Sequence, residues 1–407
     1  MGLRKVHIFL LLVPKLLLKM LVRKSNFNPM NSKLPGLGLS IFSVMSKMAA
    51  ECEAINLSQG FPNFKSDPLL IDLVNKAMQN GCNQYAPMPG DPELLKVISS
   101  KIEGLHHKRY VPETEITITA GATQAIFTAI AATIHPGDEV IIFTPAYDCY
   151  EPTIRLFGGK TISVQLEAPG FRPDWEKVSA SITSKTKLII INSPHNPSGR
   201  VFTKDDMLEL QLLVEKHNLY VISDEVYEHI IFDDLSHFSV AGFETLSKRT
   251  FITASFGKTF HNTGWKIGYC AAPELLMKEF RKVHQYNVFS VNAPIQKALS
   301  TYMKQADTYL NLASFYQQKR DYFLELIAPS RFRVLPSQGT YFQLLDFSDI
   351  TTEEDVNFAK RLTKDYRIAT IPTSVFNANK EDFKQLRVCF AKTNETLEAA
   401  ADILNNI

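Results

Sequence analysis

A lysine and an aspartate in this 407-residue sequence could do chemistry together. Lys258 follows a glycine in Ser255-Phe-Gly-Lys258. A partly desolvated lysine near another cation, such as Lys266, loses its proton more easily than a free one and can form a Schiff base. Asp224 ends an apolar run, where a carboxylate stays ionised only if it faces a cation. Considered separately, Lys258 is more simply explained as a surface lysine and Asp224 as a residue that caps the end of a strand.

A candidate phosphate site accompanies this pair. The turn Ala120-Gly-Ala-Thr123 opens directly into a helical pattern, and the free N–H groups of a helix N-terminus suit a phosphate. The Ser255 hydroxyl and the Lys266 ammonium could complete an anion cradle. Together with the other candidate groups, this cradle matches pyridoxal phosphate. The other groups are a carboxylate for a ring nitrogen, an aromatic side chain, an Asn and Tyr pair, and a reactive lysine.

Alternating strands and helices must position these groups. Five short β-branched runs, most of them apolar on both faces, predict strands of a parallel sheet: 115–119, 139–143, 187–191, 219–223 and 250–254. Helical patterns cover 123–134 and 203–217, and the second begins with a Thr203/Asp206 pair that resembles a capping box. The alternation predicts an α/β domain. Polar residues follow each of the five predicted strands. Because ligands bind beyond the carboxyl ends of the strands in such sheets, these five clusters predict a binding pocket at that edge.

The pattern changes beyond residue 295. Long helical stretches within 294–328 precede predicted strands at 331–335 and 340–345, which indicates a separate α+β domain. We expect a large cofactor-binding domain at 59–295, and a small domain made of 30–58 together with 296–407.

The charge balance argues against a nucleic-acid partner. The chain has 44 basic and 42 acidic residues, and residues 1–24 hold six of the basic ones and no acid. Without this segment the balance is 38 against 42, a net charge of −4. We expect residues 1–29 to be a disordered leader, or to follow from a start codon set too far upstream. A basic membrane-surface segment is the alternative, and membrane association is not expected.

The five cysteines are scattered and never spaced as CxxC. This spacing predicts neither a disulfide framework nor a metal site, and it favours a reducing, cytoplasmic location.

Residues 30–407 resemble the class I/II aminotransferases of fold type I, and most closely the methionine, glutamine and kynurenine aminotransferase branch. Nine motifs in order carry the resemblance: Asn56-Leu-Ser-Gln-Gly-Phe-Pro62, Asn83-Gln-Tyr-Ala-Pro87, Thr119-Ala-Gly-Ala-Thr123, Tyr147-Asp-Cys-Tyr150, Asn192-Ser-Pro-His-Asn-Pro-Ser-Gly199, Ser223-Asp-Glu-Val-Tyr227, Ser255-Phe-Gly-Lys258, Thr263-Gly-Trp-Lys-Ile-Gly268 and Leu386-Arg-Val-Cys-Phe390. The resemblance implies a large domain with a mostly parallel seven-stranded sheet and a smaller α+β domain.

The resemblance also implies how pyridoxal phosphate is held. Lys258 would carry it as a Schiff base and then act as general base, while Asp224 would keep its pyridine nitrogen protonated. Asn196 and Tyr227 would bind the ring oxygen, and Tyr147 would stack on the ring face. The implied phosphate contacts are Gly121, Ala122, Thr123, Ser255, Lys266 and the Tyr85 of a second subunit. Lys266 occupies a position where many relatives have arginine. Its ammonium group offers a point charge to the phosphate, without the paired hydrogen bonds that a planar guanidinium makes.

For the substrate, the resemblance implies that Arg387 binds the α-carboxylate, assisted by Asn196 and the Gly60 backbone. We expect aromatic residues at the entrance: Phe61, Tyr85, Phe289 and Tyr341. The expected partners are amino-acid and 2-oxo-acid substrates and a homodimer, with Tyr85 and Phe289 contributed across its interface.

The predicted activity is transfer of an amino group from methionine, glutamine or an aromatic amino acid such as kynurenine to a 2-oxo acid, with ping-pong kinetics. A carbon–sulfur β-lyase acting on cystathionine or cysteine conjugates is the alternative, because both reactions begin with the same proton abstraction. A transcription regulator with a domain of this kind is disfavoured, since only about 29 residues precede the match, too few for a helix-turn-helix domain.

Overall fold

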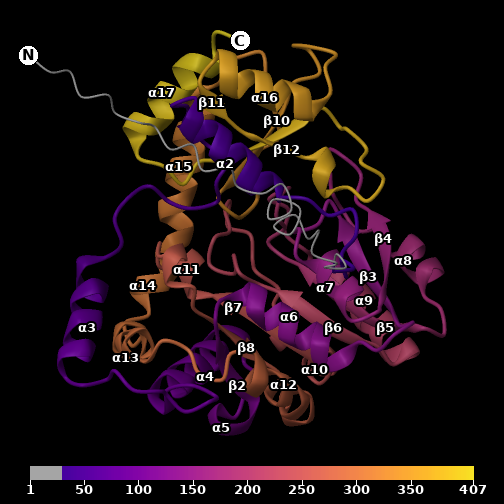
Figure 1. Cartoon of the computed structure of the whole chain (residues 1–407), viewed down its shortest axis with the longest axis vertical. Helices are drawn as coiled ribbons and strands as arrows, with labels where there is room; N and C mark the ends of the chain where they lie inside the picture. The colour runs from indigo at the N-terminus through magenta and orange to yellow at the C-terminus, as the bar shows by residue number, and fades with distance from the viewer. Residues whose placement is uncertain (1–29) are drawn as a thin grey trace, which may run out of the picture. The chain divides into compact units, whose positions relative to one another are not determined.

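A seven-stranded sheet is the largest sheet of the structure (Figure 1). The computed structural model describes residues 30–407, so the predicted leader at 1–29 lies outside the described residues. The strands of the three sheets are β1 (Ile55–Asn56), β2 (Ile116–Thr119), β3 (Glu139–Thr144), β4 (Lys160–Gln165), β5 (Thr186–Asn192), β6 (Tyr220–Asp224), β7 (Thr250–Ser255), β8 (Gly268–Ala271), β9 (Arg333–Val334), β10 (Phe342–Asp346), β11 (Ile368–Ala369), β12 (Ile371–Pro372) and β13 (Gln385–Cys389).

The described α-helices are α2 (Ile41–Glu51), α3 (Pro68–Gln79), α4 (Pro92–His106), α5 (Pro112–Glu115), α6 (Ala122–Thr133), α7 (Tyr150–Leu156), α8 (Trp175–Ser181), α9 (Lys204–His217), α10 (Glu244–Ser247), α11 (Phe256–Thr259), α12 (Glu274–Asn287), α13 (Ala293–Tyr302), α14 (Asp307–Leu310), α15 (Leu312–Leu326), α16 (Asp355–Asp365) and α17 (Asn394–Leu404). Within residues 30–407, no helix is both long enough and apolar enough to cross a bilayer.

The large sheet is mostly parallel, as predicted. Its strand order is β2-β8-β7-β6-β5-β3-β4, and only β8 runs antiparallel to its neighbours β2 and β7. Since β2 and β7 are both antiparallel to β8, they run in the same direction, and the carboxyl ends of β2, β5, β6 and β7 meet on one rim.

The central strands of this sheet are buried on both faces, which explains why β3, β5 and β7 are largely apolar at consecutive positions. In β3, Val140 and Ile142 pack in a cluster with α6, α7 and α12, whereas Ile141 and Phe143 pack on the opposite side with α8 and α9. Side chains alternate between the faces of a strand, so each apolar run supplies two cores.

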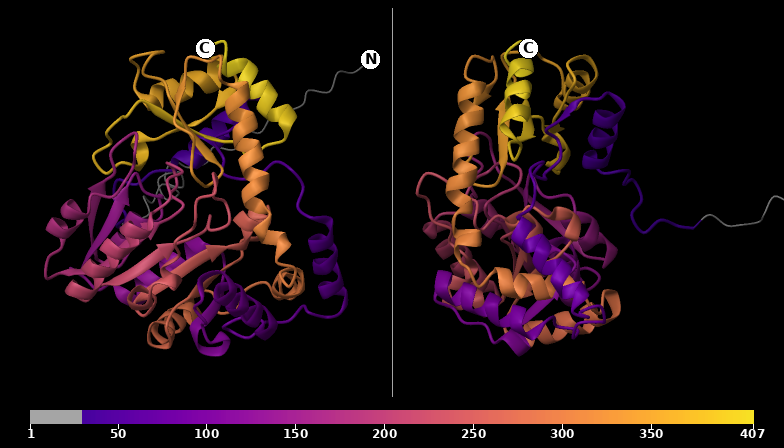
Figure 2. Two further views of the ribbon diagram at one scale, coloured as in Figure 1. Left: turned by 180° about the vertical axis from the view of Figure 1, so that it is seen from behind. Right: turned by 90° about the vertical axis from the view of Figure 1, so that its left-hand side faces the viewer.

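A second, smaller sheet region joins the two ends of the described chain. The antiparallel sheet β12-β13-β10-β9 lies with α16 and α17, and β1 pairs in parallel with β11 through Ile55 and Ile368. Figure 2 shows the long α15 running from the level of the large sheet to this region. Residues 38–407 form one compact unit, and residues 30–37, without helix or strand, belong to a separate one. The predicted domain boundaries at 58 and 295 stay a prediction.

The five predicted strands are confirmed, and so is the capping box of Thr203 and Asp206 at the start of α9. The helical stretches predicted within 294–328 are confirmed as α13, α14 and α15. Turns at 303–306 and 311 separate these helices, although no proline breaks the sequence there. The pattern of the sequence did not indicate β4 or β8.

Candidate active site

A cavity of about 280 Å³ opens at the carboxyl rim of the large sheet. It collects most of the predicted site residues: Gly60, Gly121, Ala122, Thr123, Tyr147, Asn196, Asp224, Tyr227, Ser255, Lys258, Lys266 and Arg387. The strands β2, β5, β6 and β7 each deliver polar residues at or just beyond their last position. The rest of this set comes from the loop at Gly60, from Tyr147 beyond β3, from Lys266 just before β8, and from Arg387 on β13.

Lys258 lies on the short helix α11, directly after β7. Its Nζ donates to the Gly60 carbonyl and to the Tyr341 hydroxyl, both at 2.9 Å. Burial lowers the pKa of this amine to about 8, and Arg387 and Lys266 push it in the same direction. A sizeable fraction of Lys258 is therefore unprotonated and nucleophilic near neutral pH.

Asp224 is the last residue of β6 and is almost fully buried. Its Oδ2 accepts from the Tyr150 hydroxyl at 2.6 Å, and its Oδ1 accepts from the Val226 backbone N–H at 3.3 Å. Burial raises the pKa of this carboxyl to about 6, and the Tyr150 hydrogen bond opposes part of the rise. A cation placed against Asp224 would keep it ionised.

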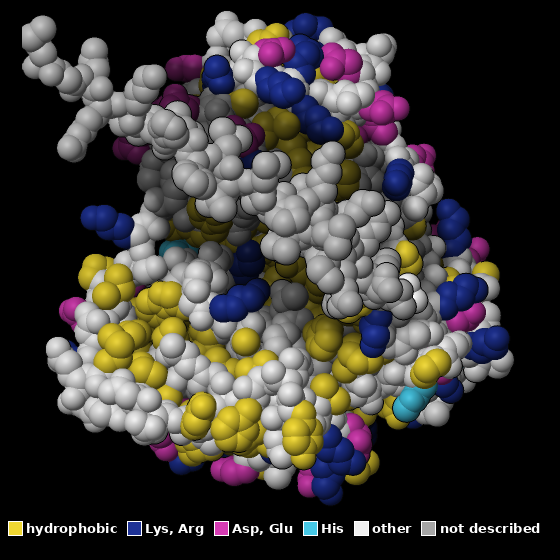
Figure 3. Space-filling view, viewed as in Figure 1, with side chains coloured by type: hydrophobic (Ala, Val, Ile, Leu, Met, Phe, Trp, Pro, Cys, Tyr) yellow, Lys and Arg dark blue, Asp and Glu magenta, His cyan; other side chains and the backbone are white. Residues whose placement is uncertain are grey.

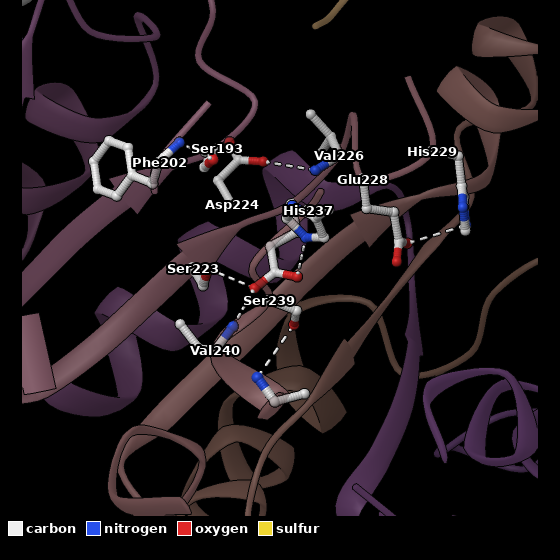
Figure 4. A network of polar contacts seen from close by, with 12 residues as sticks. Ser193, Phe202, Ser223, Asp224, Val226, Glu228, His229, His237, Ser239 and Val240 are labelled. Carbon is white, nitrogen blue, oxygen red and sulfur yellow. Dashed lines mark hydrogen bonds and ion pairs between the residues drawn. The ribbon is translucent and has the colours of Figure 1, made fainter. Parts of the chain in front are cut away.

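A second polar network holds the segment that follows β6. Glu225 accepts from the Ser223 hydroxyl at 2.7 Å and from the Val240 N–H at 3.2 Å, and it pairs with His237 at 2.9 Å (Figure 4). On the same segment, Glu228 pairs with Lys101 at 2.6 Å. These buried contacts hold the backbone on both sides of Asp224 and Tyr227, so the two cavity residues have little freedom to move.

The start of α6 is suited to an anion. Gly121 caps the helix at φ +76° and no side chain accepts from the first N–H groups, so these point at the cavity without a side-chain partner. Ser255, Lys266 and Thr263 line the same cavity. Helix N–H groups together with an ammonium favour a phosphate here.

Arg387 lies on β13 and is 1% exposed, which rules out a solvated strand arginine. Its two terminal nitrogens donate to the Asn196 Oδ1 at 2.8 Å and to the Ser58 carbonyl at 2.9 Å, while its Nε has no partner. The guanidinium lies 3.8 Å from the ring centre of Phe342 and 5.0 Å from that of Phe42. Within residues 30–407 no carboxylate pairs with this buried guanidinium, so it is suited to an incoming carboxylate.

None of the four predicted entrance residues lines this cavity of the single chain, and two of them, Tyr85 and Phe289, are expected to act from a second subunit. Phe61, Tyr85 and Phe289 are at least partly exposed and are not among the residues that line this cavity. Tyr341 is fully buried behind Lys258 and does not form an entrance.

The sequence reasoning missed three contributors. Phe42 reaches the cavity from α2, Asn192 ends β5 and donates to the Asp224 carbonyl, and Tyr150 binds the Asp224 carboxylate. Asn192 and Tyr150 were part of recognised motifs but had no role assigned. Nothing in the local sequence around Phe42 indicates its place.

The residues present fit pyridoxal phosphate. Uncapped helix N–H groups and Lys266 suit its phosphate, the buried Asp224 needs a cation such as a protonated ring nitrogen, and Lys258 offers an amine of lowered pKa for its aldehyde. The donor set includes no feature that excludes this cofactor.

Comparison with known proteins agrees with this chemistry. The family model for aminotransferase class I and II matches residues 53–404. The methionine aminotransferase of Escherichia coli (strain K12) is 45% identical over 383 residues, which cover 93% of this chain and 99% of that protein. A kynurenine–oxoglutarate transaminase 3 of Rattus norvegicus is 34% identical and covers 91% of this chain and 88% of its own. The crystal structure of an Escherichia coli protein with a methionine aminotransferase function has a TM-score of 0.91 at 45% identity, covering 93% and 99% of the two chains.

Proposed function

Because this chain belongs to the class I and II aminotransferases, which use pyridoxal phosphate, we propose that its amino donor is methionine or another neutral amino acid with a sulfur-containing, amide or aromatic side chain. One observation carries the proposal. Among the described residues that line the cavity, the only lysines and arginines are Lys258, Lys266 and Arg387. Lys258 and Lys266 suit the cofactor, so Arg387 is the cation that remains for the α-carboxylate of the donor. A second carboxylate on the donor's side chain would then have no cation to pair with.

The remaining walls support a neutral side chain. Phe42, Ile126, Val226 and Phe342 line the cavity, and the rings of Phe42 and Phe342 lie against Arg387. A donor held at Arg387 would therefore have aromatic surface beside it, which favours apolar or soft sulfur-containing groups. The relatives named for methionine and for kynurenine agree with this preference.

The chain's own residues divide the work of the reaction. When bound, pyridoxal phosphate supplies the electron sink that accepts the electron pair left when the Cα–H bond of the donor breaks. Arg387 binds the donor's α-carboxylate and so orients its Cα. The Lys258 amine takes the proton from that Cα, and the Asp224 carboxylate would hold the ring nitrogen in its protonated form.

A panel of amino donors tests the substrate class. We expect methionine, glutamine, phenylalanine or kynurenine to give the highest kcat/KM with mixed 2-oxo acids, and aspartate to be at least about 10-fold poorer, because its second carboxylate would be buried without a cation. Thiol release from cystathionine without any oxo acid is measured in parallel, since it would indicate the β-lyase. Aspartate as the best donor would contradict the proposal.

We also propose a homodimer whose partner completes the site. Tyr85 is 83% exposed, and its ring packs edge-on against Phe289, which is 43% exposed, at 5.5 Å. Figure 3 shows hydrophobic side chains gathered over the face that carries α3, α4 and α12. Large exposed aromatic side chains of this kind are typical of an interface.

The cytoplasmic location of the protein stays a prediction. The five cysteines are free, without disulfide bonds.

Mixed dimers test whether Tyr85 acts across the interface. Lys258→Ala and Tyr85→Ala proteins, each poorly active alone, are unfolded, mixed and refolded together. If Tyr85 serves the partner's site, each mixed dimer contains one intact site, and statistical mixing restores about one quarter of wild-type activity. Sedimentation checks that the species is a dimer. No recovery in a confirmed mixed dimer would place Tyr85 in its own subunit's site or outside any site.

A further inference from the structure

Tyr341 makes a contact with Lys258 that the proposed reaction has not yet used. It immediately precedes β10 and is fully buried. Its hydroxyl lies 2.9 Å from the Lys258 Nζ and 2.6 Å from the Gly60 carbonyl oxygen. The Lys258 Nζ lies 2.9 Å from the same carbonyl, so the three groups form a closed triangle.

The chemistry of the three groups sets the direction of each hydrogen bond. The Gly60 carbonyl can only accept, so the Tyr341 hydroxyl donates its proton there. The lone pairs of the Tyr341 oxygen are then free to accept an N–H of Lys258, and the Gly60 carbonyl accepts another. The amine therefore lies against two acceptors whose positions are set by separate parts of the chain.

The protein holds Tyr341 in place from several sides. The Tyr227 ring packs edge-on against it at 5.2 Å, and the Tyr316 ring lies 5.7 Å away. The preceding residue, Thr340, has φ +67°, a conformation that is a genuine outlier for a β-branched residue. Thr340 keeps it because its N–H donates to the Ile230 carbonyl at 2.9 Å and its Oγ1 accepts from the Phe342 N–H at 3.1 Å.

A strained backbone that persists inside a fully buried turn indicates that the surrounding structure overdetermines it, as often happens at functional sites. Here the strained residue directly precedes the tyrosine that contacts Lys258. Gly60 is equally constrained, since a Cβ there would lie 2.7 Å from the Phe342 ring. Both acceptors are therefore rigid.

We propose that Tyr341 is a positioning residue that holds the free amine of Lys258 where it can exchange a proton with the donor's Cα. This inference rests on the proposed function, in which Lys258 moves that proton. Among the described residues, Tyr341 makes no hydrogen bond to the terminal nitrogens of Arg387 or to the start of α6, although it packs against Tyr227. Its loss should therefore slow proton transfer far more than it weakens substrate binding.

Tyr341→Phe tests the inference, and Tyr316→Phe is the matched control. Tyr316 is a neighbouring, fully buried tyrosine whose hydroxyl has no partner in the part of the chain that the structure describes, so its removal deletes no hydrogen bond there. For Tyr341→Phe we expect kcat to fall about 10- to 100-fold with KM changed less than about twofold, because a small misplacement of a reacting group has effects of this size. The control should keep both constants.

A second readout does not depend on the loaded enzyme. Lys258 in the cofactor-free full-length protein is labelled with a limiting amount of an amine-directed acylating reagent over a range of pH, and the modified peptide is quantified by mass spectrometry. Losing an acceptor destabilises the protonated amine, so Tyr341→Phe should lower the apparent pKa of Lys258 by about half a unit or more. The control should leave it unchanged.

Unchanged kcat and unchanged labelling in a folded Tyr341→Phe protein would overturn the inference. Equal effects in Tyr316→Phe would do the same, because they would indicate general packing. If the wild-type protein transaminates no donor, the proposed function fails, and the labelling curves still decide whether Tyr341 acts on the amine.

Discussion

Lys258→Ala is expected to reduce transamination more than about 10⁴-fold, since the same side chain would hold the cofactor and move the proton. The amine is suited to both tasks, because burial lowers its pKa to about 8. The measurements are turnover with the best donor and borohydride trapping followed by intact mass. The wild-type chain should gain the mass of the reduced cofactor adduct, and the variant should not.

A surface lysine serves as the control for this substitution. Lys248 is well exposed and pairs with Glu244 one helical turn away, so Lys248→Ala should keep both turnover and the trapped adduct. Undiminished turnover in Lys258→Ala would refute the assignment of this residue, and with it the proton-transfer role on which the inference for Tyr341 depends.

Asp224→Asn should lower the rate by about 10²- to 10³-fold, the range typical of losing one preorganised charge in an active site. Asparagine has nearly the same shape and keeps an oxygen that can accept from Tyr150. The loss would therefore report the missing negative charge. Single-turnover kinetics with the best donor measure it, and the amount of folded protein is compared by circular dichroism.

The same substitution should stabilise the cofactor-free protein at neutral pH. The pKa of Asp224 is raised from about 3.9 in an unfolded chain to about 6. A group with a raised pKa contributes its stability fully below the unfolded pKa, and that contribution is lost as pH rises through the folded pKa. The ionised carboxylate then costs up to about 3 kcal/mol at pH 7 and above. Asparagine avoids this cost, so the Tm difference should favour the variant at pH 7.5 and shrink toward pH 4.

Asp355→Asn separates charge loss from structural damage. Asp355 is also buried with a raised pKa, caused mainly by burial, but it binds Ser374 and does not line the cavity. Its substitution should alter stability and leave kcat unchanged. If Asp224→Asn lost activity and folded protein in equal measure, Asp224 would have a structural role only.

Local sequence patterns were sufficient for the parallel strands, and together with the family resemblance they named most of the residues that line the cavity. The runs that form β3, β5 and β7 are apolar at consecutive positions. Such a run is typical of a strand that is buried on both faces of a sheet, because consecutive side chains point to opposite faces. The polar residues that follow these strands come together because parallel strands end on one rim. The edge strand β4 is half exposed and mixes polar with apolar residues, and β8 (Gly268–Ala271) has no β-branched residue, so neither shows the β-branched apolar run that marks the predicted strands.

Chain-distant packing decided the rest. Phe42 reaches Arg387 from α2, and Gly60, Lys258 and Tyr341 meet although long stretches of sequence separate them. The sequence motifs identify Lys258, Asp224 and Arg387 as chemical groups, because their types and neighbours are local properties. Which hydroxyl lies against the lysine, and which rings flank the arginine, depends on how separate segments pack, and no local periodicity encodes that.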